Sequence, residues 1–169
     1  MRIADRIAEN LVLRGVTHGF GIVGGGNIHL WDAVHARIKL ISVHHEQAAV
    51  MAATAYYRVC GRLAPVIVTT GAGSANALTG VLAAYMDSIP VLVLSGNEMS
   101  AHLRIDERVK GVQGYRSDLV AAPMTKWAAT VRNARLCMDW LDEAIECALE
   151  PRQGPVWLDV PKDIQNAMG

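Results

Sequence analysis

Apolar positions along the chain follow two spacings that alternate from one end to the other. The first segment has its apolar residues on one helical face, namely Ile3, Ile7, Ala8, Leu11 and Val12. Gly15 follows at the place where a helix C-terminal cap is expected. Short apolar runs and longer stretches rich in Ala and Leu then succeed each other, which predicts alternating strands and helices.

The apolar runs predict strands at 16–23, 39–43, 65–70, 90–95, 124–131 and 156–160. The stretches between them predict helices at 28–37, 47–60, 74–88 and 137–149. Strands joined through helices run parallel, because a parallel pair needs a long crossover. We therefore expect an α/β fold with three layers, doubly wound, in which a parallel sheet of about six strands carries helices on both faces. Residues 1–169 are expected to form one domain.

The segment 97–118 interrupts this alternation. It is rich in charge, contains Gly111 and Gly114, and has no sustained apolar period. The residues leave two interpretations open, a surface loop or a lid over a site. Its basic side chains could contact an acidic substrate or a partner chain; they are Arg104, Arg108, Lys110 and Arg116.

Charge and composition exclude several classes of protein. Lys and Arg number 16, as do Asp and Glu, so no positive excess is present to bind nucleic acid or an anionic membrane. No apolar run approaches the roughly 18 residues of a membrane span. Cys60, Cys137 and Cys147 lack the close spacing of metal ligands, which predicts buried free thiols in a reducing cytoplasm.

Glu46 is the most informative residue, because it lies where an apolar strand gives way to an Ala-rich helix. In an open α/β sheet, ligands bind at the carboxyl ends of the strands. A carboxylate in the first turn also stabilises a helix by itself. Glu46 is therefore either a helix-capping group or a ligand-binding group.

Two glycine-rich turns are predicted at the same edge of the sheet. Gly24-Gly25-Gly26-Asn27 follows the first strand, and Gly71-Ala72-Gly73-Ser74-Ala75-Asn76 follows the third. Glycine lets the backbone approach a ligand, although a plain turn explains the first segment equally well. The second could also be a helix start capped by Ser74. Gly19-x-Gly21-x-x-Gly24 is not interpreted as a dinucleotide fingerprint, because its first glycines fall inside the strand.

Other catalytic motifs do not occur in the sequence. His44 and His45 are adjacent and point to opposite sides of an extended chain, which disfavours a metal pair. H-E-x-x-H, C-x-x-C and G-x-S-x-G are all missing, which disfavours metal and serine hydrolases. The Glu46 turn and the two glycine turns can instead contribute to one concave site.

Further segments occur in a recognisable order. They are Gly15-Val16, Phe20-Gly21-Ile22, His45-Glu46-Gln47-Ala48, Thr70-Gly71-Ala72-Gly73, Ala84-Tyr85-Met86-Asp87-Ser88-Ile89-Pro90, Thr125-Lys126, and the stretch from Gly154-Pro155-Val156 to Pro161-Lys162-Asp163. Together with Asn76 and Gln113 they resemble the pyrimidine-binding domain of thiamine-diphosphate enzymes, most closely that of the acetolactate synthase family. The similarity covers nearly the whole chain.

The resemblance implies a cofactor and a set of site residues. In that family the acid matching Glu46 hydrogen-bonds N1′ of the aminopyrimidine of thiamine diphosphate. This bond assists conversion to the imino form, whose 4′-nitrogen removes the proton from thiazolium C2. Gln113 is implied on the substrate side. The residues implied on the pyrimidine side are Gly24, Gly25, Gly71, Gly73 and Asn76.

Three positions depart from the family pattern. Ala72 stands where Pro is usual, Thr54-Ala55 replaces an Asp-Gly pair, and Val112 precedes Gln113 where Phe is usual. The departures put the choice of substrate in doubt, whereas they leave the expectation of cofactor binding unchanged.

The sequence lacks Gly-Asp-Gly, which together with a downstream Asn holds the metal ion in the diphosphate-binding domain of these enzymes. The resemblance therefore implies half of an active site, with magnesium bound by a separate subunit that carries this motif, in a heterotetramer or larger assembly. Met1 and the complete domain pattern favour a natural small subunit over a truncated chain. Flavin is not expected, because the middle domain that holds it in some relatives is missing.

The expected reaction is decarboxylation of a 2-oxo acid and joining of the fragment to an acceptor, as in acetolactate synthase. A decarboxylase that releases an aldehyde is the nearest alternative. A non-catalytic binding or regulatory relic of the fold is the alternative from a different class.

Overall fold

The computed structural model describes residues 1–103 and 111–169, which form a six-stranded parallel sheet with helices around it. The strands are β1 (His18–Gly21), β2 (Lys39–Ser42), β3 (Pro65–Val68), β4 (Leu92–Asn97), β5 (Trp127–Thr130) and β6 (Val156–Pro161). Their order is β2-β1-β3-β4-β6-β5, and all neighbours run parallel. The predicted parallel sheet is confirmed.

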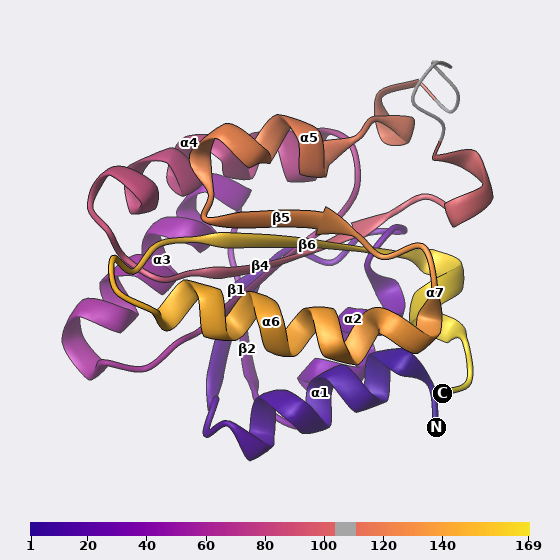
Figure 1. Cartoon of the computed structure of the whole chain (residues 1–169), viewed down its shortest axis with the longest axis horizontal. Helices are drawn as coiled ribbons and strands as arrows, with labels where there is room; N and C mark the ends of the chain where they lie inside the picture. Colours follow the sequence, from indigo (N-terminus) through magenta and orange to yellow (C-terminus); the bar gives the residue numbers. More distant parts are fainter. Residues whose placement is uncertain (104–110) are drawn as a thin grey trace.

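Helices cover both faces of the sheet and complete three layers (Figure 1). One layer comprises α1 (Ile3–Leu13), α2 (Ile28–His35), α6 (Cys137–Leu149) and α7 (Lys162–Asn166). The other comprises α3 (Glu46–Cys60), α4 (Ala72–Met86) and α5 (Ser117–Ala121). Strand side chains alternate between the layers, since Leu92 and Leu94 pack in the first and Val93 packs in the second. The three-layer α/β fold is therefore confirmed.

Short 3-10 helices connect the longer elements; they are η1 (Ser100–His102), η2 (Gly111–Gly114), η3 (Ala122–Met124) and η4 (Ala134–Leu136). Two of them fall within the segment 97–118, and α5 begins at its end. Arg104, Arg108 and Lys110 lie outside the described residues. The interpretation of this segment as a loop or a lid stays a prediction.

The boundaries of the elements differ by a few residues from those predicted. β3 ends at Val68, so Thr69 and Thr70 belong to the following turn rather than to the strand. α3 begins at Glu46, one residue before its predicted start. Gly15 has a φ of +77° directly after α1, which agrees with the predicted C-terminal cap.

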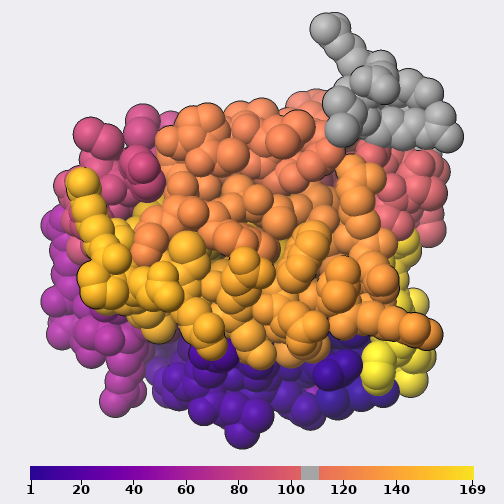
Figure 2. All heavy atoms as spheres, in the orientation of Figure 1, coloured from indigo at the N-terminus to yellow at the C-terminus, as the bar shows by residue number. Residues whose placement is uncertain are grey.

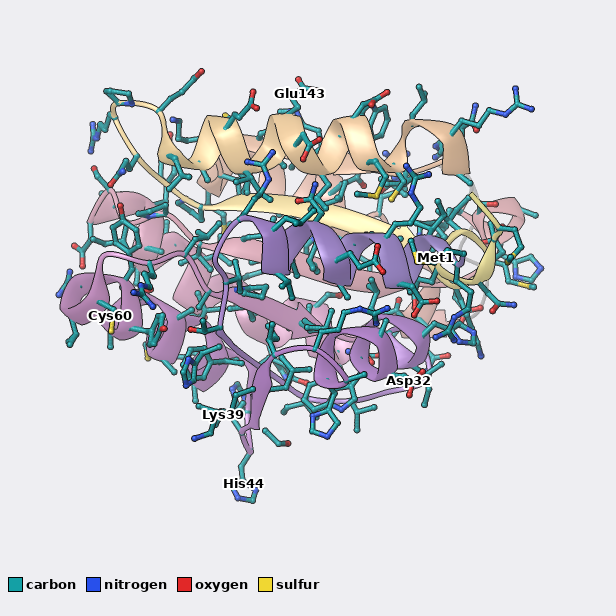
Figure 3. The ribbon with its side chains drawn as sticks, turned by 90° about the horizontal axis from the view of Figure 1, so that it is seen from below. Met1, Asp32, Lys39, His44, Cys60 and Glu143 are labelled. Carbon is teal, nitrogen blue, oxygen red and sulfur yellow. The ribbon has the colours of Figure 1, made fainter. Side chains whose placement is uncertain are left out.

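β2 lies at one edge of the sheet and pairs only with β1 among the strands described. Lys39, Ile41 and Ser42 on this strand are exposed. Figure 3 shows Lys39 and His44 at this outer edge, with His44 directed away from the body of the molecule. Among the strands that lead into the candidate site, β2, which precedes Glu46, is therefore the most exposed.

The two ends of the chain lie side by side next to α1. The Gly169 N–H donates to the Met1 carbonyl oxygen at 3.0 Å, and the Ile3 N–H donates to the Ala167 carbonyl oxygen at 2.9 Å. In Figure 2 the indigo and yellow atoms of these ends meet at the lower right. The ends are thus on the side of the molecule that carries α1 and α7.

The cysteines are all free but differ in exposure. Cys137 is buried, and burial raises the pKa of its thiol to about 12. Cys147 is half-buried. Cys60 is exposed at the end of α3 (Figure 3), so its predicted burial is wrong. The helix stops there at Gly61, and its last turn faces outward.

None of the helices within the described ranges is long and apolar enough to cross a membrane.

Helices α3 and α4 approach each other closely through small residues. A Cβ placed on Gly80 would lie 2.6 Å from Cβ of Val50 and 3.1 Å from the carbonyl oxygen of Gln47. The start of α3 is thereby held against the middle of α4. The small buried residues of α4 are Gly73, Ser74, Ala77, Gly80 and Ala84.

An ion pair fixes the start of α5. Arg116 Nε and Nη2 donate to Asp118 Oδ1 at 2.8 Å and Oδ2 at 2.5 Å. Burial by itself raises the pKa of Asp118, but the Arg116 guanidinium and other hydrogen bonds outweigh it and hold that pKa below its usual value. The pair joins the residue before α5 to the first turn of the helix.

Replacing Gly80 with Ala is expected to lower the free energy of unfolding by about 1 to 3 kcal/mol, because the new methyl group overlaps Val50. Without this contact, Gly to Ala in a helix would raise stability by up to about 1 kcal/mol. Urea unfolding of Gly80→Ala measures the sign of the change. Thr79→Ala, on the exposed side of the same helix, serves as the control, and a stabilised Gly80→Ala protein would refute the close contact.

Asp118→Asn is expected to lower the free energy of unfolding by about 1 to 3 kcal/mol near pH 7, because Arg116 loses its partner. The folded-state pKa of Asp118 lies below 3.8, so the ionised carboxylate stabilises the fold above about pH 4. That stabilisation is lost as the pH falls through the folded-state pKa, and the gap between wild type and variant should close. Urea unfolding near pH 7 and near pH 3 tests this, with the more exposed Asp142→Asn as control. A gap that does not change with pH would contradict it.

Candidate functional site

The connections from the neighbouring strands β1 and β3 leave toward opposite faces of the sheet. Helix α2, after β1, covers one face of the sheet, whereas α3 and α4, after β2 and β3, cover the other. In an open α/β sheet this leaves a crevice outside the carboxyl ends of the two strands, where ligands bind. The turns 22–27 and 69–71 border this crevice.

Asn27 organises the turn after β1. Its side chain is fully buried; Oδ1 accepts from the Gly24 N–H at 2.8 Å, and Nδ2 donates to the Ile22 carbonyl oxygen at 2.9 Å. A Cβ on Gly24 would lie 2.6 Å from the Thr69 side chain, whereas a Cβ on Gly25 would meet open space. Gly24 is therefore required by packing, and Gly25 is the glycine that a ligand can approach.

Thr69 connects the parts of the site, although no sequence motif includes it. Its Oγ1 accepts from the Gly26 N–H at 3.0 Å. Its side chain is also what a Cβ on Gly24 or Gly73 would overlap, at 2.6 and 2.7 Å. A polar residue directly after the apolar strand β3 is the signal that could have identified it.

Glu46 is the first residue of α3 and is 7% exposed. His45 provides the capping hydrogen bond, since its Nδ1 accepts from the Gln47 N–H at 3.2 Å. Glu46 itself lies in the first turn, where a carboxylate stabilises the helix, so both interpretations of Glu46 stay predictions. Its Oε2 accepts from Asn76 Nδ2 at 3.1 Å, which joins the starts of α3 and α4.

Two glycines at the start of α4 allow close approaches, one of Glu46 and the other of the segment that carries Gln113. A Cβ on Gly73 would lie 3.1 Å from Glu46 Oε1. Gly71 has a φ of +73°, a conformation that favours glycine, and a Cβ there would lie 3.1 Å from the Val112 carbonyl oxygen. The backbone at the start of α4 can thus come close to a flat ligand.

Ser74 does not cap α4, which corrects that alternative. Gly71 is the N-cap and makes no side-chain capping bond. The Ser74 hydroxyl donates to the Gly71 carbonyl oxygen at 3.0 Å and lies 2.8 Å from the Tyr115 hydroxyl. Burial raises the pKa of Tyr115, which keeps its phenol neutral. Ser74 therefore ties α4 to the segment that carries Gln113.

Gln113 is exposed and borders a cavity of about 600 Å³. Its carbonyl oxygen accepts from Thr70 Oγ1 at 2.6 Å. Gly25, Gly26 and Thr70 line the same cavity. The ionisable residues on its wall are His29, Glu98, His102, Lys162 and Asp163, of which only Lys162 and Asp163 belong to a segment that carries the family resemblance.

A larger cavity, of about 690 Å³, lies elsewhere. It is lined by Gly15, Gly61 and Leu63 among others, at the amino end of the sheet. It contains none of the candidate residues, so its size does not make it the site.

The predicted residues fall into two adjoining groups. Glu46, Gly73 and Asn76 lie together at the starts of α3 and α4. The second group surrounds Thr69 and Thr70 and consists of Gly24, Gly25, Gly71 and Gln113. Within residues 1–103 and 111–169, no three His, Cys, Asp or Glu side chains are grouped to hold a metal ion.

The first group can bind a ring nitrogen. A carboxylate with little exposure, fixed through one oxygen by an amide, presents its other oxygen in a defined direction. Because little water competes, a hydrogen bond or a shared proton at that oxygen is stronger than in solution. The arrangement suits a flat, nitrogen-containing ligand.

The sequence is similar to those of known proteins. Residues 1–121 match the family described as thiamine pyrophosphate enzyme, N-terminal TPP binding domain. Over 165 residues the chain is 37% identical to the acetolactate synthase large subunit of Haemophilus influenzae and 36% identical to the isozyme 3 large subunit of Escherichia coli. Over 160 residues it is 34% identical to the acetolactate synthase large subunit of Lactococcus lactis.

These alignments cover 94 to 96% of this chain. The chain spans 27 to 28% of the length of these relatives. The resemblance found in the sequence is confirmed over nearly the whole chain. The chain belongs to the thiamine pyrophosphate enzyme family, as a member of its N-terminal TPP-binding domain, and its cofactor is thiamine diphosphate.

Proposed function

We propose that this chain is the pyrimidine-binding half of an enzyme that decarboxylates a 2-oxo acid and joins the fragment to an acceptor. The observation that carries the proposal is the Glu46 carboxylate, bonded to Asn76 through one oxygen and facing glycine with the other. The similarity to acetolactate synthase large subunits supports the reaction class.

The residues present fit the aminopyrimidine of the cofactor. A methyl group on Gly73 would lie against Glu46 Oε1, so the glycine keeps the space beside that oxygen open. Gly71 has a different effect, since it lets the backbone of Val112 and Gln113 approach the start of α4. When bound, thiamine diphosphate supplies the electron sink that lets a 2-oxo acid lose carbon dioxide.

Glu46 has the central role in this proposal. It would hold a proton between its free oxygen and the ring nitrogen N1′, and its low exposure would strengthen that bond. Asn76 would keep the carboxylate turned toward the ring through its bond to Oε2. Gln113 and Gly25, on the wall of the cavity, would border the 2-oxo acid.

The outer face of α4 is apolar, which supports the proposal that a partner chain covers it. None of its 15 residues is charged, and Leu82 and Met86 are 46% and 68% exposed. Met51 of α3 and Leu119 of α5 add further exposed apolar surface in the same layer. A helix without a charged face is normally covered.

We assign this face to a diphosphate-binding subunit that carries Gly-Asp-Gly and the magnesium ligands. Helix α4 begins beside Glu46, so a subunit on this face would also reach the site. Each half would then contribute one wall, in a heterotetramer or larger assembly. The free thiols, with Cys60 exposed, support a location in the reducing cytoplasm.

Glu46→Gln is expected to lower kcat by about 10²- to 10⁴-fold, because an amide cannot share a proton with N1′ as a carboxylate does. Assembly and the fold should be unchanged, since Gln keeps the size of the side chain. The measurement is turnover of a 2-oxo acid by the assembled enzyme with thiamine diphosphate and magnesium. Glu146→Gln, on the exposed face of α6, is the matched control. Near-normal turnover of Glu46→Gln would refute the role of the carboxylate.

Leu82→Glu is expected to weaken assembly with the partner at least about tenfold, because a charge would be buried in the apolar contact. The tagged chain is purified from cells that produce it, and the co-purifying subunit is checked for Gly-Asp-Gly before its affinity is measured. Leu13→Glu places the same charge on an exposed leucine of α1 and should leave assembly unchanged. Equal affinities for the two variants would show that the α4 face is not the interface.

A further inference from the structure

Asp159 is a fully buried carboxylate on β6 that is not among the candidate site residues. Arg116, the residue before α5, makes its ion pair with Asp118. A buried carboxylate without a cation is costly unless hydrogen bonds satisfy it, and burial raises the pKa of Asp159. The side chains that donate hydrogen bonds to Asp159 therefore hold the carboxylate in place, and the carboxylate in turn holds them.

Side chains from several elements donate to this carboxylate. Ser117 Oγ, at the start of α5, lies 2.8 Å from Oδ1 and 2.6 Å from Oδ2. Trp157 Nε1 donates to Oδ1 at 2.9 Å. Asn97 Nδ2 and Thr130 Oγ1 both donate to Oδ2 at 3.1 Å. The carboxylate thus joins the ends of β4, β5 and β6 to α5.

Asn97 extends the network to the site. Its Oδ1 accepts from the Glu98 N–H at 2.9 Å, which leaves Nδ2 as the group that faces Asp159. The same Oδ1 lies 3.0 Å from Thr70 Oγ1. The single proton of the Thr70 hydroxyl is shared between this oxygen and the Gln113 carbonyl oxygen, which lies 2.6 Å from Oγ1. Gln113 is therefore connected to Asp159 through two side chains.

We propose that Asp159 is a positioning residue that sets the place of Gln113 in the site. It acts through Ser117 on one side of the turn, and through Asn97 and Thr70 on the other. The part of this inference that concerns substrate rests on the proposed function, in which Gln113 borders the 2-oxo acid. The part that concerns the turn rests on the chain alone.

No side chain of the same shape can accept all the hydrogen bonds that the Asp159 carboxylate accepts. Trp157 Nε1 and Asn97 Nδ2 can only donate, and they face different oxygens of Asp159. An Asn at 159 would turn its NH₂ toward one of these donors in either orientation. Asp159→Asn therefore loosens the network, and Thr70→Val breaks it one step from Gln113 without changing the size of the side chain.

The first measurement is amide hydrogen exchange over residues 111–117 in the chain alone. Asp159→Asn and Thr70→Val should each speed exchange there by about tenfold or more. Thr130→Val is the matched control, because it removes a bond to the same carboxylate but lies on β5, away from Gln113. It should leave exchange at 111–114 unchanged. Equal exchange in wild type and Thr70→Val would overturn the proposal even if Asp159→Asn fails to fold.

The second measurement is turnover of pyruvate by the assembled enzyme with thiamine diphosphate and magnesium. Asp159→Asn and Thr70→Val should raise KM by about tenfold with little change in kcat, and the double variant should not exceed the larger single effect. Thr130→Val should keep the wild-type KM. A uniform loss of activity in all three variants, with KM unchanged, would show a general loss of stability and overturn the role in positioning.

The two measurements separate two kinds of failure. If wild type turns over no 2-oxo acid but the exchange pattern is as expected, the proposed function fails and the positioning of the turn stands. If wild type is active and neither exchange nor KM responds to Thr70→Val, the positioning proposal fails and the proposed function stands.

Discussion

The close approach of α3 and α4 is the constraint on which the site depends. Glu46 and Asn76 are 30 positions apart in the chain, and their hydrogen bond exists because the helices that carry them meet without intervening side chains. Glycine in a helix normally costs about 1 kcal/mol relative to alanine. At Gly73 and Gly80 that cost is offset by a contact that no larger residue permits, and the contact places a carboxylate beside open backbone.

The two sides of the site are held by different means. Packing of helix starts fixes the side around Glu46, where little polar bonding is involved beyond the bond to Asn76. Polar side chains fix the side around Gln113, since Thr70, Asn97 and Ser117 all belong to one network. A packed contact tolerates little change in volume, whereas a polar network tolerates little change in donor and acceptor pattern. Substitutions on the two sides should therefore fail for different reasons.

Much of the fold follows from the alternation of apolar runs and helical stretches, which identifies the parallel sheet and its helices. The order of strands does not follow, because an edge strand such as β2 and a central strand such as β3 have similar apolar content. Glu46 could be predicted as a site residue from its place at a strand end. Thr69 could have been selected on the same ground, since it directly follows the apolar strand β3. Asp159 could not, because a single polar residue inside an apolar run has no periodicity, and its partners come from distant segments. Cys60 was assigned wrongly since a helical stripe does not show where the last turn of a helix leaves the core.

The exposed edge strand β2 has a consequence for how Glu46 is delivered to the site. β2 has one neighbour in the described sheet and few covered side chains, so it is the strand that local opening would release most easily. The carboxylate at its end nevertheless keeps its place, because α3 is anchored to α4 rather than to the strand. The geometry of the Glu46 carboxylate therefore depends more on the helix pair than on the edge strand.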